Sequence, residues 1–498
     1  TNATPGTPIS NSNPLYLGTH NTNTGWLNGY ADELAIWNDD LNPSEVAELY
    51  NSGNGLDASS NSGNYTSSPN LQGYWNFNEN SGSTITDLSG NGNHGTIYGA
   101  TWSDDVSPSY NGPDWYVSTE GYDTDNDGSE DLPFATIQHG IDAASDGHTV
   151  HVAAGTYVEN INFNGKNIAV IGEDRETTII DGDQNGSTIR FVSGETNETL
   201  LEGFTIRNGG GEMDGGGILI ADDSEPVIDN CIITENNALW GGGIYFSGEM
   251  SGTVQNCIIS NNTASNNGGG VGLGSASPVF ENCIIINNSA GGEGGGIESH
   301  NNSSFTLENC TISGNSAGDT GGGVRCFGGS PTINGSLIND NIATVEGGGM
   351  KFTGSTPTIE NCTIVNNVST ACAGGIVAVY DVVTITNSIV FDNDVGSFCT
   401  IQGGSFNVSY SNIEGGYEGE GNFDADPLFC NPSNGEYTIA ENSPCLGAGQ
   451  DGADVGYSYW SCLESYNNYS LSFDGDDDYV SIADNNQFHI NTLTISAW

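Results

Sequence analysis

Two of the chain's six lysine and arginine residues occupy the same position of a repeated sequence unit. Arg325 and Lys351 are 26 residues apart, and Glu298 stands 27 residues before Arg325. Each of the three is the fifth residue from the first glycine of a glycine triplet, and His300 follows two residues after Glu298. A lysine or arginine base suits β-elimination on an acidic sugar, where Ca²⁺ usually neutralises the carboxylate. These residues are therefore candidates for catalysis by a polysaccharide lyase.

A structural role is the alternative for the same residues. Opposite charges at neighbouring positions of a β-surface relieve repulsion and stabilise the surface. No dense aspartate group accompanies Arg325 and Lys351, and the repeat has no outward set of paired aspartates of the kind that hydrolases use. We expect Glu298, His300, Arg325, Lys351 and Tyr245 to share one exposed face, and we favour a solvated ladder of charges over a catalytic site.

A second candidate site is an acidic loop near residue 125. Asp123, Asp125 and Asp127 alternate, and Gly128 follows them, as in loops that hold Ca²⁺ through carboxylate oxygens. The acid expected at the twelfth position is missing, since Phe134 stands there. Ca²⁺ is thus the cofactor that this loop would bind, and an acidic turn without a metal is the alternative.

Exposed aromatic side chains are the usual platforms for sugar rings. Tyr245 and Phe327 are expected on the outward face, and Trp240 lies on the turn before a glycine triplet. We take these three as candidate ligand-binding residues, although a tryptophan on a turn can equally well be a packing residue.

The elements that must position these side chains come from a repeat of about 26 residues. An Asn-Cys pair, or its Gly-Ser or Asn-Ser variant, recurs seven times, and a glycine triplet recurs at the same interval. Five residues after each cysteine or serine stands an asparagine. The members of this asparagine column are Asn236, Asn262, Asn288, Asn315, Asn341, Asn367 and Asn393.

This period predicts a right-handed parallel β-helix. Apolar residues alternate within each unit, and the unit is too short for a strand-helix-strand crossover. Successive coils of such a solenoid lie about 4.8 Å apart, so identical residues stack directly above one another. We expect the asparagines to form a hydrogen-bonded ladder, the cysteines to point inward, and the glycine triplets to make sharp corners.

Two further cysteine pairs are disulfide candidates. Cys430 and Cys445 flank a short segment near the end of the solenoid, and a disulfide there would close an end that has no neighbouring coil. Cys372 and Cys399 are 27 residues apart, so adjacent coils could bring them together. Disulfides of this kind fit an oxidising exterior.

The charge of the chain excludes several classes of partner. The formal net charge is −57, with 63 acidic residues against 6 lysines and arginines. Such a surface repels nucleic acids and anionic membranes, and it repels polyanionic polysaccharides unless Ca²⁺ bridges them. No apolar run is long enough for a transmembrane helix. We expect an extracellular or cell-surface protein that contacts a polysaccharide, a glycan or another protein.

The repeat resembles the polymorphic outer-membrane protein repeats that occur in bacterial adhesins. More broadly, it resembles the coils of the pectate-lyase-like β-helix superfamily. The first coils are similar at residues 115–119 (WYVST), 133–138 (PFATIQ) and 155–157 (GTY), and the last turns at 424–429 (DADPLF) and 443–445 (SPC). The resemblance implies a β-helix over residues 114–462, with regular coils over about 204–393. That superfamily contains lyases, hydrolases and adhesins, so the resemblance indicates a fold more than an activity.

Both flanks resemble parts of laminin-G or concanavalin-like jelly rolls. The similarity lies at residues 29–37 (GYADELAIW), 71–77 (LQGYWNF), 87–92 (DLSGNG), 472–475 (SFDG) and 496–498 (SAW). It implies the end of one jelly roll at 1–57, a linker with an opening hairpin at 58–113 (hairpin about 69–104), and the start of another at 463–498. Residues 69–104 could complete the first jelly roll or form a separate stub.

The sequence as a whole favours an all-β, secreted or cell-surface protein without catalytic activity. The resemblance suggests a carbohydrate-binding or adhesion module on a β-helix scaffold. A polysaccharide lyase or hydrolase that acts at the Arg325 and Lys351 face is the first rival hypothesis. A purely structural spacer is the second.

Overall fold

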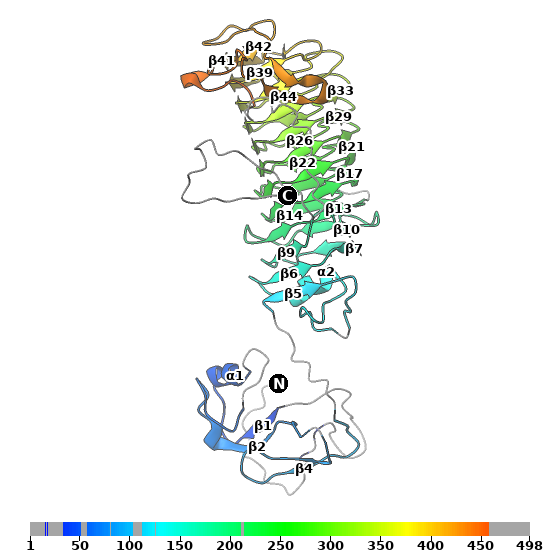
Figure 1. Ribbon diagram of the computed structural model, residues 1–498, viewed down its shortest axis with the longest axis vertical. Coiled ribbons are helices and arrows are strands. Elements are labelled where there is room, and N and C mark those ends of the chain that lie inside the picture. The colour runs from blue at the N-terminus through cyan, green and yellow to red at the C-terminus, as the bar shows by residue number, and fades with distance from the viewer. Residues whose placement is uncertain are drawn as a thin grey trace, which may run out of the picture. The chain divides into compact units, whose positions relative to one another are not determined.

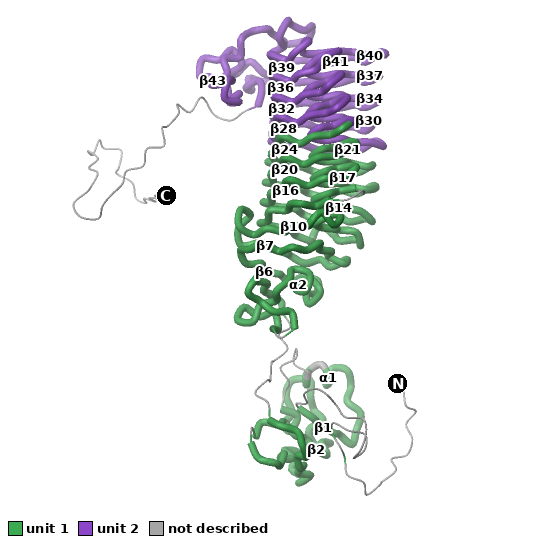
Figure 2. The backbone as a smooth tube through the Cα atoms, turned by 90° about the vertical axis from the view of Figure 1, so that its right-hand side faces the viewer, with its two compact units in different colours: residues 1–291 green, residues 292–498 purple. Residues whose placement is uncertain are grey.

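The computed structural model describes residues 15, 17, 33–50, 57–79, 81–102, 112–124, 126–210 and 214–457. The chain forms two compact units, residues 1–291 and 292–498, which are shown in different colours in Figure 2. Both units contain coils of a parallel β-solenoid, and each is described by itself. Within the described part of the chain, no helix has the length and the apolar character that crossing a membrane would take.

The N-terminal flank forms a small packed element in the first unit. Strand β1 (Leu34–Trp37) pairs antiparallel with β2 (Leu71–Trp75), and helix α1 (Pro43–Tyr50) lies between them in sequence. A second antiparallel pair consists of β3 (Thr84–Ile85) and β4 (Gly95–Thr96). Residues of β1 and β2 form one apolar cluster, in which Leu71 and Tyr74 pack against Trp37. Residues 71–75 therefore pack with residues 34–37. The jelly-roll assignment itself stays a prediction, and its second copy, 463–498, lies outside the described residues.

Each coil of the first unit passes through three parallel sheets in the order sheet 1, sheet 2, sheet 3 (Figure 1). A fourth, smaller sheet covers the corner between sheets 2 and 3. Sheet 1 contains β5 (Asp114–Val117), β6 (Thr149–Val152), β9 (Ala169–Gly172), β12 (Leu200–Glu202), β15 (Val227–Asp229), β19 (Thr253–Gln255) and β23 (Val279–Glu281); sheet 2 contains β7 (Gly155–Val158), β10 (Thr178–Asp181), β13 (Thr205–Arg207), β16 (Ile232–Thr234), β20 (Ile258–Ser260) and β24 (Ile284–Ile286); sheet 3 contains β8 (Ile161–Asn162), β11 (Ile189–Phe191), β14 (Ile218–Ala221), β18 (Ile244–Ser247) and β22 (Val271–Gly274); sheet 4 contains β17 (Asn237–Trp240), β21 (Thr263–Asn267) and β25 (Ser289–Ala290).

The second unit repeats this arrangement. Sheet 1 contains β27 (Thr306–Glu308), β31 (Thr332–Asn334), β35 (Thr358–Glu360), β38 (Val382–Thr386) and β41 (Ser405–Ser409); sheet 2 contains β28 (Thr311–Ser313), β32 (Leu337–Asn339), β36 (Thr363–Val365), β39 (Ile389–Phe391) and β42 (Asn412–Ile413); sheet 3 contains β26 (Ile297–His300), β30 (Val324–Phe327), β34 (Met350–Thr353), β37 (Ile376–Val379) and β40 (Phe398–Ile401); sheet 4 contains β29 (Ser316–Ala317) and β33 (Ile342–Ala343). A final hairpin pairs β43 (Phe429–Asn431) with β44 (Glu436–Ile439).

The asparagine column forms a buried amide ladder within each unit. The Asn236 amide Nδ2 donates to Asn262 Oδ1 at 3.0 Å, and Asn262 Nδ2 donates to Asn288 Oδ1 at the same distance. In the second unit the same bonds join Asn315, Asn341, Asn367 and Asn393 in sequence. The backbone N–H of each of these donors also reaches the next Oδ1. The ladder thus satisfies polar groups at a tight corner that excludes water.

The Asn-Cys pairs make the turn from sheet 1 to sheet 2. The asparagine of each pair has a positive φ, such as 54° at Asn256, and Gly335 takes this position where asparagine is absent. Asparagine and glycine are the residues that tolerate this conformation best. The following cysteine points into the core, where serine can replace it: the Cys310 backbone N–H donates to Ser336 Oγ at 3.1 Å. The cysteine column is therefore a structural feature of the turn.

Helix α2 (Ile137–Ala143) covers the first coil with Ile137 and Ile141, which are fully buried. Charged groups close both of its ends. The Glu159 carboxylate accepts hydrogen bonds from the first backbone N–H groups of the helix, and Lys166 Nζ donates to three carbonyl oxygens at its end at 2.7–2.8 Å. An anion at the N-terminus and a cation at the C-terminus are the favourable arrangement for a helix dipole.

The C-terminal segment folds back on the outer face of sheet 2. Cys445 and Val455 pack against Ile389, and Tyr437 packs against Leu337 and Val365. The predicted disulfide between Cys430 and Cys445 is wrong, because Cys445 is a buried free thiol turned into this cluster. Cys430 is disulfide-bonded, but not to Cys445.

Replacement of Lys166 by methionine tests the helix cap. We expect the Lys166→Met variant to lose about 1–3 kcal/mol of unfolding free energy, because three helix-terminal carbonyls lose a charged donor. Urea denaturation followed by circular dichroism measures the change. Arg190→Met is the matched control, since Arg190 is exposed on β11. Equal midpoints for Lys166→Met and the native chain would contradict this role.

Candidate functional site

The structure stacks the charged column as the spacing predicts. Glu298 pairs with Arg325 in the register of β26 and β30, and Arg325 pairs with Lys351 in the register of β30 and β34. The next two positions of the same column are Val377 and Cys399. All five residues belong to sheet 3 of the second unit.

The expectation that this column is an exposed face is wrong for Glu298 and Arg325. Their exposed fractions are 0% and 5%, and the Lys351 side chain is 14% exposed. The cause is the turn before each strand, which lies directly on the column. A Cβ atom at Gly294 would come within 2.4 Å of the Glu298 Cβ, so only glycine allows the turn to lie this close.

The two basic residues of this column each have an acidic partner. Arg325 Nε lies 3.3 Å from Glu293 Oε1, and Lys351 Nζ lies 2.9 Å from Glu346 Oε2. Both partners belong to the turns that lie over the column. His300 Nδ1 lies 2.8 Å from Glu298 Oε1. Burial raises the pKa of the Glu298 carboxyl, and its contact with His300 works in the opposite direction.

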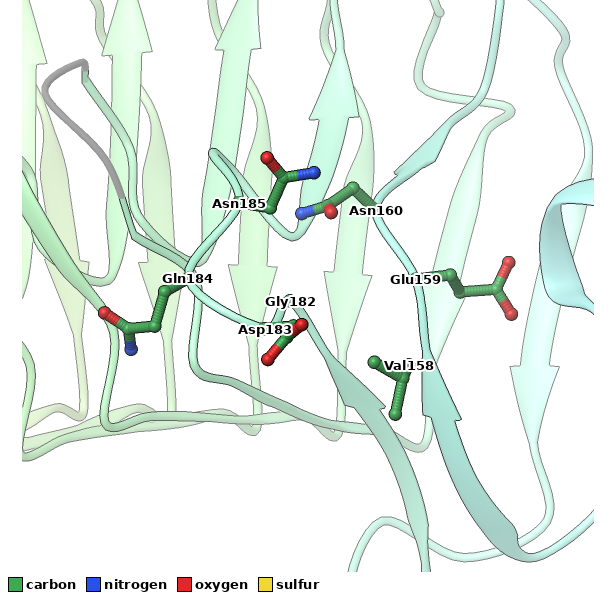
Figure 3. Close-up of a pocket in the computed structure, with 7 residues that line it drawn as sticks. All are labelled: Val158, Glu159, Asn160, Gly182, Asp183, Gln184 and Asn185. Carbon is green, nitrogen blue, oxygen red and sulfur yellow. The ribbon is translucent and has the colours of Figure 1, made fainter.

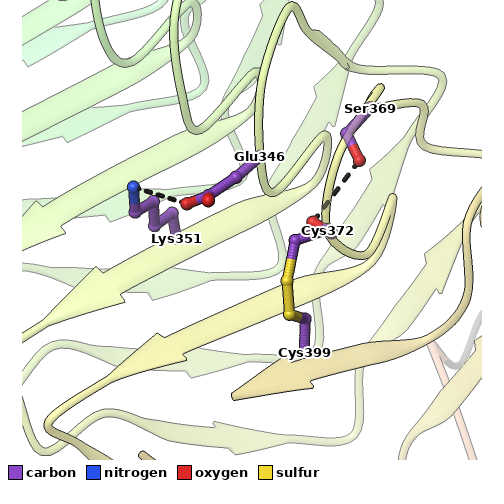
Figure 4. Close-up of a disulfide and its surroundings, with 5 residues drawn as sticks. All are labelled: Glu346, Lys351, Ser369, Cys372 and Cys399. Carbon is purple, nitrogen blue, oxygen red and sulfur yellow. Dashed lines mark hydrogen bonds and ion pairs between the residues drawn. A yellow bond between two sulfur atoms is a disulfide. The ribbon is translucent and has the colours of Figure 1, made fainter. Parts of the chain in front are cut away.

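A disulfide continues the same pattern between the turn one coil after that of Glu346 and the strand two coils after that of Lys351. Cys399, on the strand column, is bonded to Cys372, which occupies the turn position next to that of Glu346 (Figure 4). Ion pairs and a disulfide thus tie the same strand column to the same turns. This arrangement cross-links the solenoid wall and leaves Arg325 and Lys351 poorly placed to act as a base on a polysaccharide.

The acidic loop before the first coil uses two of its carboxylates, those of Asp123 and Asp127, in hydrogen bonds. Asp123 accepts from the backbone N–H of Ala135 at 2.7 Å and from Thr136 Oγ1 at 2.9 Å. Asp127 accepts from the backbone N–H of Ser129 at 3.0 Å. Asp125 lies outside the described residues, so the Ca²⁺ site stays a prediction.

The three predicted aromatic residues differ in accessibility. Phe327 is 54% exposed, and the Arg325 guanidinium carbon lies 5.7 Å from its ring centroid. Tyr245 is half-buried because its ring lies over Gly272, where an added Cβ would come within 2.7 Å of that ring. Trp240 is half-buried at the end of β17. Tyr245 and Trp240 belong to the first unit and Phe327 to the second.

Sequence reasoning missed an exposed aromatic residue of the second unit, Tyr380. It directly follows β37, is 66% exposed and has a φ of 61°. The preceding coils carry Gly328 and Gly354 at this corner, both also with positive φ. A bulky residue in the left-handed region is strained, which makes Tyr380 an outlier worth explaining. The signal in the sequence was a tyrosine where the two preceding coils carry glycine; the next coil has Gln402 at this position, with a φ of 51°. We call Phe327, Gly354 and Tyr380 the aromatic corner.

A polar pocket of about 420 Å³ lies in the first unit, where the chain leaves β7 and β10. The amides of Asn160 and Asn185 point toward one another in it, while the Glu159 carboxylate points away toward α2 (Figure 3). The pocket residues are Val158, Glu159, Asn160, Gly182, Asp183, Gln184 and Asn185. No aromatic side chain belongs to this set.

Asp381 is a buried carboxyl beside the aromatic corner. It is 1% exposed, and its Oδ1 accepts a hydrogen bond from the Ser355 backbone N–H at 2.6 Å. Its Oδ2 has no hydrogen-bond partner among the described residues. Burial raises the pKa of Asp381 to about 6, against the hydrogen bonds from Ser355 and Gly354 and the charge of Arg325.

The right-handed β-helix family model matches residues 139–333 and 268–414. The chain belongs to this family. Its β-helix is all-β in both units apart from the short helices given above. No curated protein sequence matches this chain.

Solved structures with a similar backbone include two that are named as lyases and one that is named as a methylesterase. The pectate lyase Pel9A has a TM-score of 0.42 and 14% identity, with 69% of this chain and 96% of that chain covered. A rhamnogalacturonan lyase has a TM-score of 0.35 and 16% identity, covering 64% and 90%. A pectin methylesterase from Aspergillus niger has a TM-score of 0.33 and 17% identity, covering 49% and 82%. Similarity at this level does not indicate an activity.

The raised pKa of Asp381 predicts a stability change with pH. Because the folded chain holds this proton up to about pH 6 and the unfolded chain only to about 3.8, the stabilisation is complete below 3.8 and is lost as the pH rises through 6. Asp381→Asn keeps the acceptor for Ser355 and removes the penalty. We expect it to raise the unfolding free energy at pH 7 by at most about 3 kcal/mol and to change little at pH 4.

Urea denaturation at both pH values measures this effect. Asp424→Asn, which removes the same charge from an exposed position, is the control for the net charge of the chain. Equal gains for the two variants at pH 7 would show that Asp381 carries no special penalty.

Proposed function

We propose that this protein is a non-catalytic, secreted or cell-surface carbohydrate-binding protein, and that the aromatic corner of its second unit binds the glycan. The β-helix serves as a rigid scaffold that holds two exposed rings at fixed positions. Adhesion to a glycan-bearing surface is the biological role that fits such a module.

Tyr380 is the single observation that carries this proposal. A tyrosine in the left-handed region costs of order 1–3 kcal/mol, and glycine would avoid that cost. The ring contributes little to the core, since 66% of it is exposed. A strained and exposed aromatic residue is therefore best explained by a contact outside the molecule, and sugar rings are common ligands of exposed tyrosines.

Phe327 supports the same site from β30, two coils before Tyr380. Its ring is exposed, and the buried Arg325 guanidinium beside it is fixed by the ion pair with Glu293. A ring that is already ordered before binding loses less entropy when a ligand stacks on it. The Arg325–Glu293 ion pair therefore supports the proposed binding site, because it holds the Phe327 ring in place.

The charges of the chain favour a neutral glycan. Lys166, Arg175, Arg207, Arg325 and Lys351 all contact acceptors within the protein. A net charge of −57 repels uronates unless Ca²⁺ bridges them. Ca²⁺ at the Asp123, Asp125 and Asp127 loop remains part of the proposal as a structural cofactor. An oxidising exterior fits the Cys372–Cys399 disulfide.

Substitutions at the corner test the proposal. We expect Phe327→Ala and Tyr380→Gly each to weaken glycan binding roughly tenfold, because each removes one stacking ring. Affinity electrophoresis against neutral polysaccharides and titration calorimetry with the best ligand measure the loss. Tyr380→Gly should unfold at an equal or higher urea concentration than the native chain, since it relieves strain.

Tyr122→Ala is the control, since Tyr122 is exposed in the first unit and outside the corner. A loss of binding in the control equal to that in Phe327→Ala would remove the site from the corner. Ultraviolet absorbance from unsaturated products, after incubation with pectate or alginate and Ca²⁺, would contradict the non-catalytic assignment.

A further inference from the structure

The aromatic corner belongs to a longer row that follows successive coils of the second unit. The backbone N–H groups of Asn302, Gly328, Gly354 and Tyr380 each donate to the coil that follows, at 2.9–3.4 Å. This bonding places Asn302, Gly328, Gly354, Tyr380 and Gln402 on consecutive coils. Phe327 lies one residue before Gly328, in line with Thr353 and Val379, and Phe327, Gly354 and Tyr380 are exposed. At about 4.8 Å per coil, Phe327 and Tyr380 are two coils, or roughly 10 Å, apart along the axis, and the row spans roughly 20 Å.

The position between the two rings is open. Gly354 has a φ of 65°, and a Cβ at this residue would have no heavy atom within 4 Å. Thr353, which precedes it, pairs with Phe327 on one side and with Val379 on the other. A planar group of the size of one sugar ring therefore finds no side chain of the corner in its way at Gly354.

A row of hydroxyl groups lies in the turns that lead from sheet 3 to sheet 1, a few residues after the corner position of each coil. Ser304, Ser330 and Thr356 are exposed on consecutive coils. The Ser330 backbone N–H donates to Ser304 Oγ at 3.0 Å, and Ser330 Oγ lies 2.6 Å from Thr356 Oγ1. Hydroxyls can donate and accept, as sugar hydroxyls do, so this row suits the edge of a carbohydrate chain.

We infer that the ligand of the corner is a flat, extended chain of β-1,4-linked neutral sugars that lies parallel to the solenoid axis. In such a ribbon, every second sugar presents the same face, and the repeat of two sugars matches the two-coil separation of Phe327 and Tyr380. One sugar stacks on each ring, the sugar between them lies over Gly354, and the chain edge contacts the hydroxyl row. This inference rests on the proposed function and specifies its ligand.

Chain shape and charge separate this ligand from other polysaccharides. An α-1,4-linked glucan curves, so its sugars cannot remain in register with a straight row of coils. A polyuronate would bring carboxylates to a face where Arg325 and Lys351 are already paired with acids. The row itself contains no lysine or arginine.

Titration calorimetry with β-1,4-linked gluco-, manno- and N-acetylchito-oligosaccharides of increasing length tests the inference. We expect the affinity in at least one series to rise roughly tenfold between the disaccharide and the trisaccharide, because three sugars are needed to reach both rings. Malto-oligosaccharides of equal length should show no such step. Phe327→Ala and Tyr380→Gly should each reduce the trisaccharide affinity to that of the disaccharide.

Gly354→Asn adds a test of the central position. Asparagine tolerates the left-handed conformation, so the fold should persist while its side chain enters the space of the middle sugar. We expect a roughly tenfold loss for the trisaccharide, against no change for Gly415→Asn, which places the same side chain at an open glycine with φ of 81°.

The outcomes distinguish the inference from the function on which it rests. Binding that Phe327→Ala weakens, without a length step or with equal affinity for malto-oligosaccharides, would overturn the extended ribbon and keep carbohydrate binding at the corner. No binding to any glycan in the native protein would overturn both.

Discussion

The parallel hydrogen-bonded register between successive coils is the constraint on which the other features of each unit depend. Once one strand bonds to the next in register, every residue lies about 4.8 Å from its counterpart in the following coil. A polar side chain at a tight corner can then form a hydrogen bond with the same residue of the next coil. The Asn236, Asn262 and Asn288 amides show this. A substitution in one coil would leave buried groups unsatisfied in two, which explains why the repeat is most regular where it is least exposed.

The same register controls where charges can be placed. Stacked Glu298, Arg325 and Lys351 would be an ordinary surface ladder on an open sheet. Here the glycine turns lie on top of them, and burial makes an unpaired charge costly. Glu293 and Glu346 on those turns supply the opposite charges to Arg325 and Lys351. The Cys372–Cys399 disulfide joins the next turn to the same strand column covalently. The chemistry of Arg325 and Lys351 would suit catalysis. Because they are covered by the turns and paired with acids, they instead link the strands to the turns.

A functional residue is best sought where an exposed position departs from the repeat. Gly328 and Gly354 allow positive φ at their corner without cost, and Tyr380 places a large, exposed ring at the same corner one coil later. The stacking of coils also fixes the position of such a residue. Along the axis, its distance to any position of another coil is a whole number of coil spacings. A solenoid can therefore match a periodic ligand with only two or three special residues.

The sequence by itself determined the period, the parallel β-helix, the asparagine ladder and the register of the charged column, because all of these follow from which residues recur. It could not determine burial. Alternation places Glu298 and Arg325 outward, but whether a turn then covers them depends on a close approach between segments that no period encodes. It also left Tyr380 unnoticed, because its importance lies in a backbone conformation and an exposed position. The 27-residue spacing did predict the Cys372–Cys399 disulfide, which the structure confirms. The burial of Cys445 as a free thiol was decided by how the C-terminal segment packs.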